Sequence, residues 1–124
     1  MSKKTVSIIV NCYNGEKYLQ KTLNSILKQK FKNFEVIFID NCSTDSSPRI
    51  YKKIKDKRFH YFRTKKKISL YASRNLALKK SKGKFIAFLD ADDWWSNDYL
   101  TLRKKFFKSS KMYGFSYSNC FHYF

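Results

Sequence analysis

Residues 84–93 read KFIAFLDADD, an apolar run that ends in three carboxylates within four positions. The continuous run predicts a buried strand. Asp90, Asp92 and Asp93 repel one another unless a cation neutralises them, and Mn²⁺ or Mg²⁺ suits such hard oxygen ligands. The ordinary alternative is an acidic turn whose side chains only cap backbone amides.

Strand and helix patterns alternate along the rest of the chain. Strand-like runs cover residues 6–10, 35–39 and 59–63, and helical spacing covers residues 16–29 and 69–80, with Gly83 expected to end the second helix. Further helices are expected from Ser43 or Thr44 to about Lys55 and from Ser96 or Asn97 to about Lys108, and residues 112–124 resemble one or two strands. This alternation predicts a mostly parallel α/β sheet with helices on both faces.

Polar residues follow three of the expected strands, at residues 11–16, 40–45 and 90–95. Ligands of such sheets bind beyond the carboxyl ends of the strands, so we expect the three clusters to meet at one site. Neither of the common glycine-rich phosphate loops is present, so a metal and side chains would have to hold any phosphate. Arg74 is a candidate phosphate or ribose ligand and Tyr13 a candidate for stacking on a base. A surface helix arginine and an aromatic residue at the edge of the core are the ordinary alternatives.

Composition narrows the class of protein. The 124 residues suit one domain, 27 Lys and Arg face nine Asp and Glu, and the net charge is +18. This charge favours phosphates, nucleic acid or an anionic membrane surface, unless the lysines only form a solvated surface. Three cysteines without metal spacing suggest no disulfide framework, and no run approaches the roughly 20 apolar residues of a membrane span. We therefore expect a cytoplasmic protein.

Four motifs, in order over residues 5–100, resemble those of family 2 glycosyltransferases. They are VSIIVNCYN (6–14) with YL (18–19) and SILKQ (25–29), EVIFIDNCSTD (35–45), ASRN (72–75) and KGKFIAFLDADD (82–93). The resemblance implies a GT-A (Rossmann-like) fold. It also implies an activated sugar donor, usually a UDP-sugar, together with Mn²⁺ or Mg²⁺.

The resemblance also implies roles for individual residues. The metal ligands that it implies are Asp92 and Asp93. The nucleotide-binding residues that it implies are Asn11, Tyr13, Glu16, Asp40, Asn41, Arg74, Asp90 and Ala91. Tyr13 would stack on the base with Asn11 beside it, Asp40 would lie near the base or ribose, and Asp90 would touch the ribose side. The metal would act as a Lewis acid on the leaving diphosphate.

The chain departs from the family pattern at two site positions. The family often has Pro where this chain has Asn11, and Asp where it has Asn41. Asn41 can still accept a hydrogen bond through its carbonyl oxygen, so the expected consequence is an altered nucleotide preference rather than loss of binding.

Inverting transfer needs a general base that deprotonates the acceptor hydroxyl. Only Asp98 follows Asp93 among the carboxylates, and it lies at an expected helix start. No catalytic residue is therefore identified, and the base is expected beyond residue 124. Residues 1–124 are interpreted as one partial domain, the donor-binding half of a transferase whose acceptor half is missing.

Three functional interpretations remain open. The first is this donor half, working on a glycan or lipid-linked acceptor at the inner face of a membrane. The second is a catalytically inactive nucleotide-binding fragment. The third is a basic protein that binds nucleic acid or an anionic membrane, with nucleic acid the less expected partner. Only the first two predict metal-dependent nucleotide binding that Asp92→Asn abolishes, whereas the third predicts a steep salt dependence.

Overall fold

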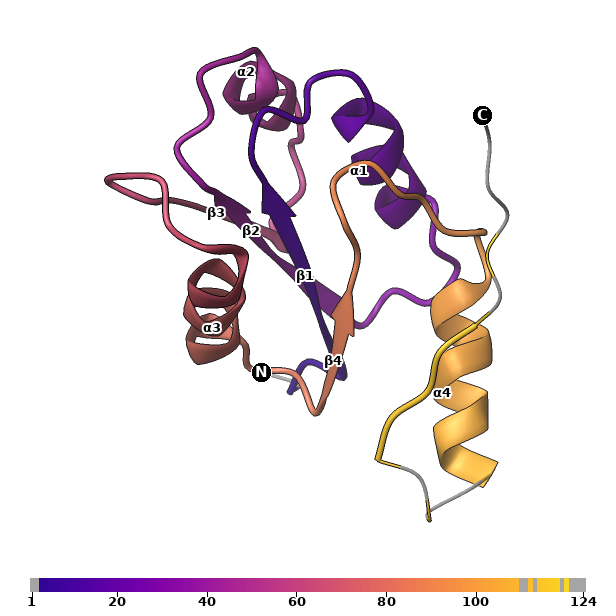
Figure 1. Ribbon diagram of the computed structural model, residues 1–124. Coiled ribbons are helices and arrows are strands. Elements are labelled where there is room, and N and C mark those ends of the chain that lie inside the picture. The colour runs from indigo at the N-terminus through magenta and orange to yellow at the C-terminus, as the bar shows by residue number, and fades with distance from the viewer. Residues whose placement is uncertain (1–2, 110–111, 113, 119, 121–124) are drawn as a thin grey trace.

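A sheet of four parallel strands forms the centre of the computed structural model, which describes residues 3–109, 112, 114–118 and 120 (Figure 1). The strands are β1 (Val6–Cys12), β2 (Phe34–Asp40), β3 (Phe59–Arg63) and β4 (Phe85–Phe88), in the order β3-β2-β1-β4. The chain thus runs outward from β1 to β3 and then returns to place β4 on the other side of β1. This reversal puts the topological switch point, where such sheets bind ligands, at the carboxyl ends of β1 and β4.

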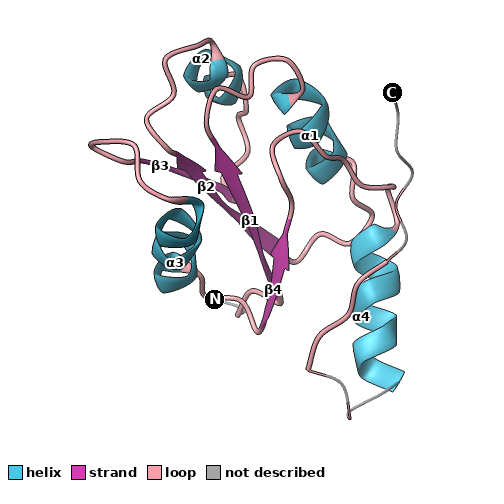
Figure 2. Cartoon of the chain, in the orientation of Figure 1, coloured by secondary structure: helices cyan, strands magenta, loops and turns pink. Residues whose placement is uncertain are grey.

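Helices cover both faces of the sheet, which confirms the predicted architecture (Figure 2). On one face, α1 (Leu19–Leu27), α2 (Ser47–Lys52) and the start of α4 (Tyr99–Ser109) pack against side chains such as Ile8 and Phe38. On the other face, Ala77 of α3 (Leu70–Lys80) packs against Ile9, Ile37 and Ile39. Consecutive residues of β1 and β2 therefore enter two separate apolar clusters, and this explains why both strands are continuous apolar runs.

The strand expected at residues 84–89 is present as β4, but the expectation that it is buried is wrong in part. In β4 burial alternates, and the side chains of Ile86 and Phe88 are 38% and 49% exposed. β4 is the edge strand beside β1, and α3 packs against β1 and β2 on the face that Ile86 and Phe88 share with it. An apolar run indicates a strand but not how far a helix extends over it.

Several helix ends differ from the predicted ones. α2 spans Ser47–Lys52, and it begins later than predicted because Cys42 has a positive φ of 63° and the amides of residues 43–46 bond to side chains instead. α1 begins at Leu19, after a turn over residues 16–18. α4 begins at Tyr99, since the Ser96 and Asn97 carbonyls accept hydrogen bonds from the Gln29 side chain and the Lys30 amide. The predicted strands in residues 112–124 are absent from the part of this tail that the structure describes, and the rest lies outside the described residues.

No helix within the described ranges is both long and apolar enough to cross a membrane.

Gly83 does not end α3 in the way the sequence suggested. The helix ends at Lys80, and Ser81 follows with an extended backbone. Gly83 is needed instead for a close approach to β1, because an added Cβ would lie 2.5 Å from the Ser7 amide nitrogen. The Gly83 amide donates to Ser7 Oγ at 2.8 Å, and that hydroxyl donates to the buried Glu35 carboxylate at 2.6 Å. These contacts fix the start of β4 against β1.

Gly83→Ala should therefore destabilise the fold. The clash is with backbone, so β4 must shift, and we expect a loss of about 2–4 kcal/mol in the free energy of unfolding. Equilibrium urea denaturation measures this loss. Gly114→Ala is the matched control, because its added Cβ meets no described atom within 4 Å. Equal stabilities of the two variants would contradict the close-approach account.

Candidate functional site

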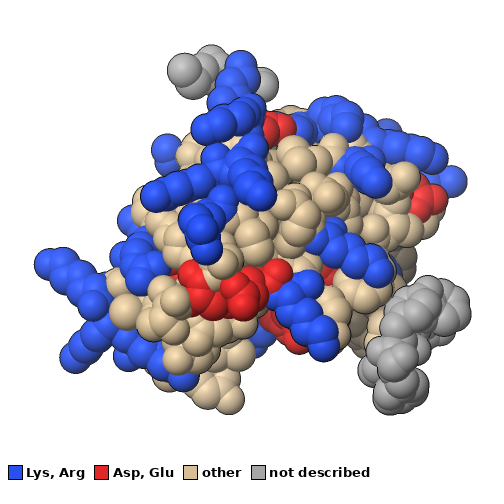
Figure 3. All heavy atoms as spheres, turned by 90° about the horizontal axis from the view of Figure 1, so that it is seen from above, with Lys and Arg blue, Asp and Glu red and all other residues tan. Residues whose placement is uncertain are grey.

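The loops after β1, β2 and β4 meet at the carboxyl edge of the sheet, as the strand order requires. An added Cβ at Gly15 would lie 3.5 Å from Ala91 Cβ, so the loops after β1 and β4 are in contact. Thr22 of α1 donates to the Ala91 carbonyl at 2.9 Å and holds the second of these loops. Viewed from above this edge, acidic side chains gather near the centre of the face, with lysines and arginines around them (Figure 3).

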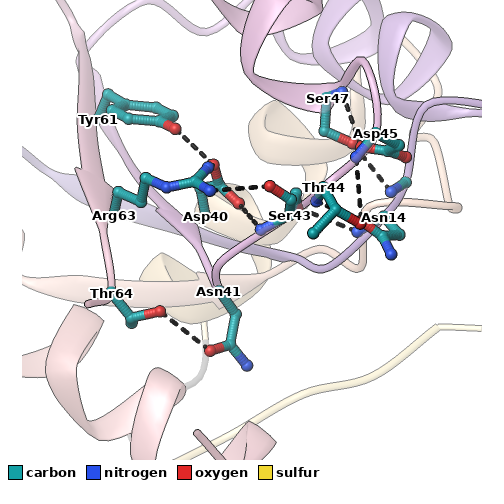
Figure 4. Close-up of polar contacts among 11 residues, drawn as sticks. Asn14, Asp40, Asn41, Ser43, Thr44, Asp45, Ser47, Tyr61, Arg63 and Thr64 are labelled. Carbon is teal, nitrogen blue, oxygen red and sulfur yellow. Dashed lines mark hydrogen bonds and ion pairs between the residues drawn. The ribbon is translucent and has the colours of Figure 1, made fainter. Parts of the chain in front are cut away.

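Asp40 is the buried charge of this edge, with no solvent exposure, and Figure 4 shows its hydrogen-bond partners. One carboxylate oxygen accepts from the Ser43 amide at 2.8 Å, and the other accepts from the Tyr61 hydroxyl at 2.5 Å and from Arg63. Arg63 also donates to the Ser43 carbonyl at 2.8 Å. We call these four residues the Asp40 cluster. A buried carboxylate is tolerated only when it is paired and hydrogen-bonded in this way.

The same cluster changes the acidity of its members. Burial, followed by the hydrogen bond to Asp40, raises the pKa of the Tyr61 phenol to about 12. The hydrogen bond with Tyr61 and then the negative charge of Asp40 raise the pKa of Arg63. Both donors therefore stay protonated over the whole physiological range.

A set of reciprocal hydrogen bonds joins the loops after β1 and β2. Asn14, with a positive φ of 49°, accepts at Oδ1 from the amides of Thr44 and Asp45 at 2.8 and 3.3 Å. The backbone amide of Asn14 donates to Ser43 Oγ at 3.0 Å. The Glu16 amide donates to Asp45, and the Glu16 carboxylate accepts from the Ser46 amide. Asn tolerates the left-handed backbone better than most residues, which suits it to this position.

Asp45 is held in its charged form by the same loops. Burial would raise its pKa, but hydrogen bonds from the Ser47 hydroxyl and from the amides of Ser47 and Glu16 outweigh burial and lower it. Glu16, a predicted nucleotide ligand, therefore has a structural partner in Ser46, and its role toward a nucleotide stays a prediction.

Asn41 holds the loop after β3. Asn41 is 7% exposed, and its side-chain Nδ2 donates to the Ile68 carbonyl at 2.7 Å. Its side-chain Oδ1 accepts from the Ile68 backbone amide at 2.9 Å and from Thr64 Oγ1 at 3.2 Å. Only a group that both donates and accepts can make this set of bonds, so an aspartate would not replace it. The carbonyl oxygen that the sequence analysis reserved for a nucleobase is thus already bonded within the protein.

Arg74 and Asp90 lie together on the side of the edge formed by α3 and β4. Arg74 Nη2 donates to Asp90 Oδ1 at 3.2 Å, and the guanidinium lies 5.6 Å from the centre of the Phe88 ring. Arg74 Nε is buried and has no hydrogen-bond partner among the described residues. An orphaned donor of this kind is costly unless a ligand oxygen occupies the position. Nearby, Ser73 donates to Asn11 Oδ1 at 2.5 Å and orients that predicted ligand.

Asp92 and Asp93 are exposed in the loop after β4. Within the described ranges no group of three or more potential metal ligands comes together. Two adjacent exposed carboxylates nevertheless suit Mn²⁺ or Mg²⁺, which commonly bind through one or two carboxylates while ligand phosphates and water fill the other positions. The donor set therefore fits a metal that arrives with a nucleotide rather than a preformed metal centre.

Sequence analysis did not identify Tyr61, Arg63 and Lys67 as residues of the site. Lys67 places its ammonium 3.6 Å from the centre of the exposed Tyr13 ring. All three belong to β3 or the loop after it. Arg63 ends β3 and Lys67 follows it, so parallel pairing places both at the edge that the other strands share, whereas Tyr61 lies inside the strand and carries no such signal.

Comparisons with known proteins agree with this geometry. The family model "Glycosyl transferase family 2" matches residues 7–118. The chain is 40% identical over 114 residues to the Escherichia coli UDP-Glc:alpha-D-GlcNAc-diphosphoundecaprenol beta-1,3-glucosyltransferase WfaP, covering 92% of this chain and 45% of that protein. It is 37% identical over 107 residues to the Bacillus subtilis putative teichuronic acid biosynthesis glycosyltransferase TuaG, covering 84% and 42%.

A solved structure shows the same fold. S. aureus TarS 1-349 in complex with UDP superposes with a TM-score of 0.80 at 35% identity, over 85% of this chain and 32% of that chain. The predicted GT-A fold is confirmed. The chain spans less than half the length of each of these relatives.

Tyr61→Phe should reveal the Asp40 cluster in two measurements. Removing the hydroxyl leaves the buried carboxylate with one donor fewer, so we expect a loss of about 1–3 kcal/mol in unfolding free energy near neutral pH. In the wild type the raised pKa of Tyr61 means that this stabilisation is present below pH ~10 and is lost as the pH rises toward 12. Denaturation at several pH values and titration of phenolate absorbance follow both effects.

Tyr51→Phe is the control for Tyr61→Phe. Burial raises the pKa of the Tyr51 phenol to about 12 as well, so either variant should lose one phenol from the alkaline end of the titration. Only Tyr61→Phe should lose the bond to Asp40. Equal stability costs at neutral pH would show that the Asp40 bond contributes nothing.

Asn41→Asp tests the attachment of the loop after β3. The new carboxylate cannot donate to the Ile68 carbonyl and repels it, so we expect a loss of about 1–3 kcal/mol in unfolding free energy. Urea denaturation measures this loss beside Asn75→Asp, a control at an exposed position of α3. Stability as high as that of the control would mean that the Asn41 amide does not hold the loop.

Proposed function

Because the chain belongs to glycosyl transferase family 2, we propose that it binds the nucleotide of an activated sugar, in first place a UDP-sugar, at the carboxyl edge of β1, β2 and β4. The observation that carries the proposal is Arg74, whose buried Nε has no partner among the described residues, at the edge where the three polar loops meet. A phosphate or ribose oxygen would satisfy this donor. The name of WfaP includes UDP-Glc, and two structures of TarS are complexes, one with UDP and one with UDP-GlcNAc.

The residues of the edge divide into contacts and supports. Tyr13 presents an exposed ring on which a base can stack, and Asn11 and Asp90 are oriented by Ser73 and Arg74. Asp40 and Asn41 are buried and act by holding the loops, so we propose that they shape the base and ribose pocket from below. Glu16 and Ala91 line the junction of the loops on either side.

Asp92 and Asp93 would hold Mn²⁺ or Mg²⁺ together with the ligand's diphosphate. The metal would supply Lewis-acid stabilisation of the charge on the leaving diphosphate. Arg74 would add a fixed positive charge beside the ribose or phosphate, already aligned by Asp90.

Transfer of the sugar is a proposal for the whole protein. We propose an inverting glycosyltransferase that extends a glycan or lipid-linked glycan at the cytoplasmic face of a membrane. The support is the family and the name of WfaP, whose acceptor is diphosphoundecaprenol-linked. The general base that the acceptor hydroxyl needs has no assignment among the residues at this edge.

The proposal predicts metal-dependent nucleotide binding. We expect UDP with Mn²⁺ to raise the melting temperature, and UDP or Mn²⁺ alone to raise it less, because each supplies part of the other's binding site. GDP, dTDP and CDP show whether the site selects the base. Asp92→Asn should abolish the metal-dependent part of the shift.

Asp98→Asn is the matched control, since it removes one carboxylate outside the edge, which accepts a hydrogen bond from Ser96 Oγ at the start of α4. The control should keep the full shift. A shift that Asp92→Asn leaves intact, or the lack of any nucleotide shift, would contradict the proposed site. Binding of nucleic acid or anionic vesicles that weakens steeply with salt would then favour a basic surface instead.

A further inference from the structure

The loop after β3, residues 64–69, is attached to the carboxyl edge at both of its ends. The Thr64 amide donates to the Asp40 carbonyl at 3.0 Å, and Asn41 bonds both backbone groups of Ile68. The backbone on either side of Lys67 is therefore fixed relative to β2, while the lysine side chain is exposed and free to turn on its four-carbon stem.

The Lys67 ammonium lies over the face of Tyr13, 3.6 Å from the ring centre. No carboxylate among the described residues forms an ion pair with Lys67. The ammonium thus sits on the exposed aromatic ring of the proposed nucleotide site and has a weak, replaceable partner. A base that stacks on this face of Tyr13 must first displace it.

We infer that Lys67 is a ligand-binding residue of this site, which rests on Tyr13 in the free protein and pairs with the diphosphate of a bound nucleotide. The inference rests on the proposed function and assigns a residue to it. A nucleoside diphosphate brings both a flat base for the ring and an anion for the displaced ammonium. The ligand class selected in this way is a nucleotide that carries phosphate, in preference to a nucleoside.

The balance of the two contacts gives an unusual expectation. Displacing the ammonium from the exposed ring lowers the binding constant of a ligand by a factor of about 2–5. A charge-assisted hydrogen bond from the ammonium to phosphate raises the binding constant by more than that. A nucleoside displaces the ammonium but carries no phosphate with which the ammonium can pair. Removing the charge of Lys67 should therefore weaken binding of a diphosphate and leave binding of a nucleoside unchanged or stronger.

Lys67→Met keeps the length of the side chain and removes the ammonium. With Mg²⁺ present throughout, we expect its affinity for UDP to fall about 5–20-fold and its affinity for uridine to stay equal or rise by up to about 5-fold, relative to wild type. Calorimetry measures UDP, and NMR titration measures the weaker uridine. Lys65→Met is the matched control, because it removes one positive charge from the same loop and should change UDP affinity less than about 2-fold.

Three results would overturn the inference. Equal loss of UDP affinity in Lys67→Met and Lys65→Met would mean that only the general positive field matters. Loss of uridine affinity as large as that of UDP would mean that Lys67 merely holds the Tyr13 ring in place. Lack of UDP binding by the wild-type protein would remove the proposed function together with this inference, whereas the first two results remove the inference alone.

Discussion

A single buried negative charge, the Asp40 carboxylate at the end of β2, constrains the whole carboxyl edge. Withdrawing a carboxylate from water costs several kcal/mol, by order of magnitude, unless nearby donors offset the loss. The donors come from separate parts of the chain, Tyr61 and Arg63 from β3 and the Ser43 amide from the loop after β2. Satisfying one charge therefore fixes β3 beside β2 and sets the path of the loop.

That constraint passes to the other loops through hydrogen bonds. Ser43 also accepts from the Asn14 amide, and Asn14 in turn accepts from Thr44 and Asp45, so the loop after β1 follows the loop after β2. Asn41, next to Asp40, holds the loop after β3 in the same way. The buried residues form the support, and above it lie the exposed Tyr13, Asp92 and Asp93 and the half-buried Arg74, while the exposed Lys67 side chain stays free to turn. A site that is supported in this way holds its contacts in place before the ligand arrives.

The architecture could be predicted from the sequence because the apolar periodicity of a segment follows from which of its faces are buried. The runs at residues 6–10 and 35–39 lie in central strands with a helix layer on each side, so their pattern and their environment agree. The starts of α2 and α4 could not be predicted, because they depend on Asn14, Glu16 and Gln29, which lie 30 to 71 positions away along the chain. Gly83 was recognised as a special position for the wrong reason, since its constraint is a neighbouring strand. Arg63 and Lys67 were missed because the chain has 27 lysines and arginines, and residue type alone does not show which of them lie at the carboxyl edge.

We propose above that a nucleotide binds where the loops after β1, β2 and β4 meet. Amide chemical-shift mapping by NMR during titration with UDP and Mg²⁺ locates this binding site residue by residue. We expect the largest shifts at residues 11–16, 40–45, 63–68, 74 and 90–93, all at the carboxyl edge. Shifts spread over the exposed lysines, or centred at the opposite edge near Glu35, His60 and Lys82, would contradict the proposal.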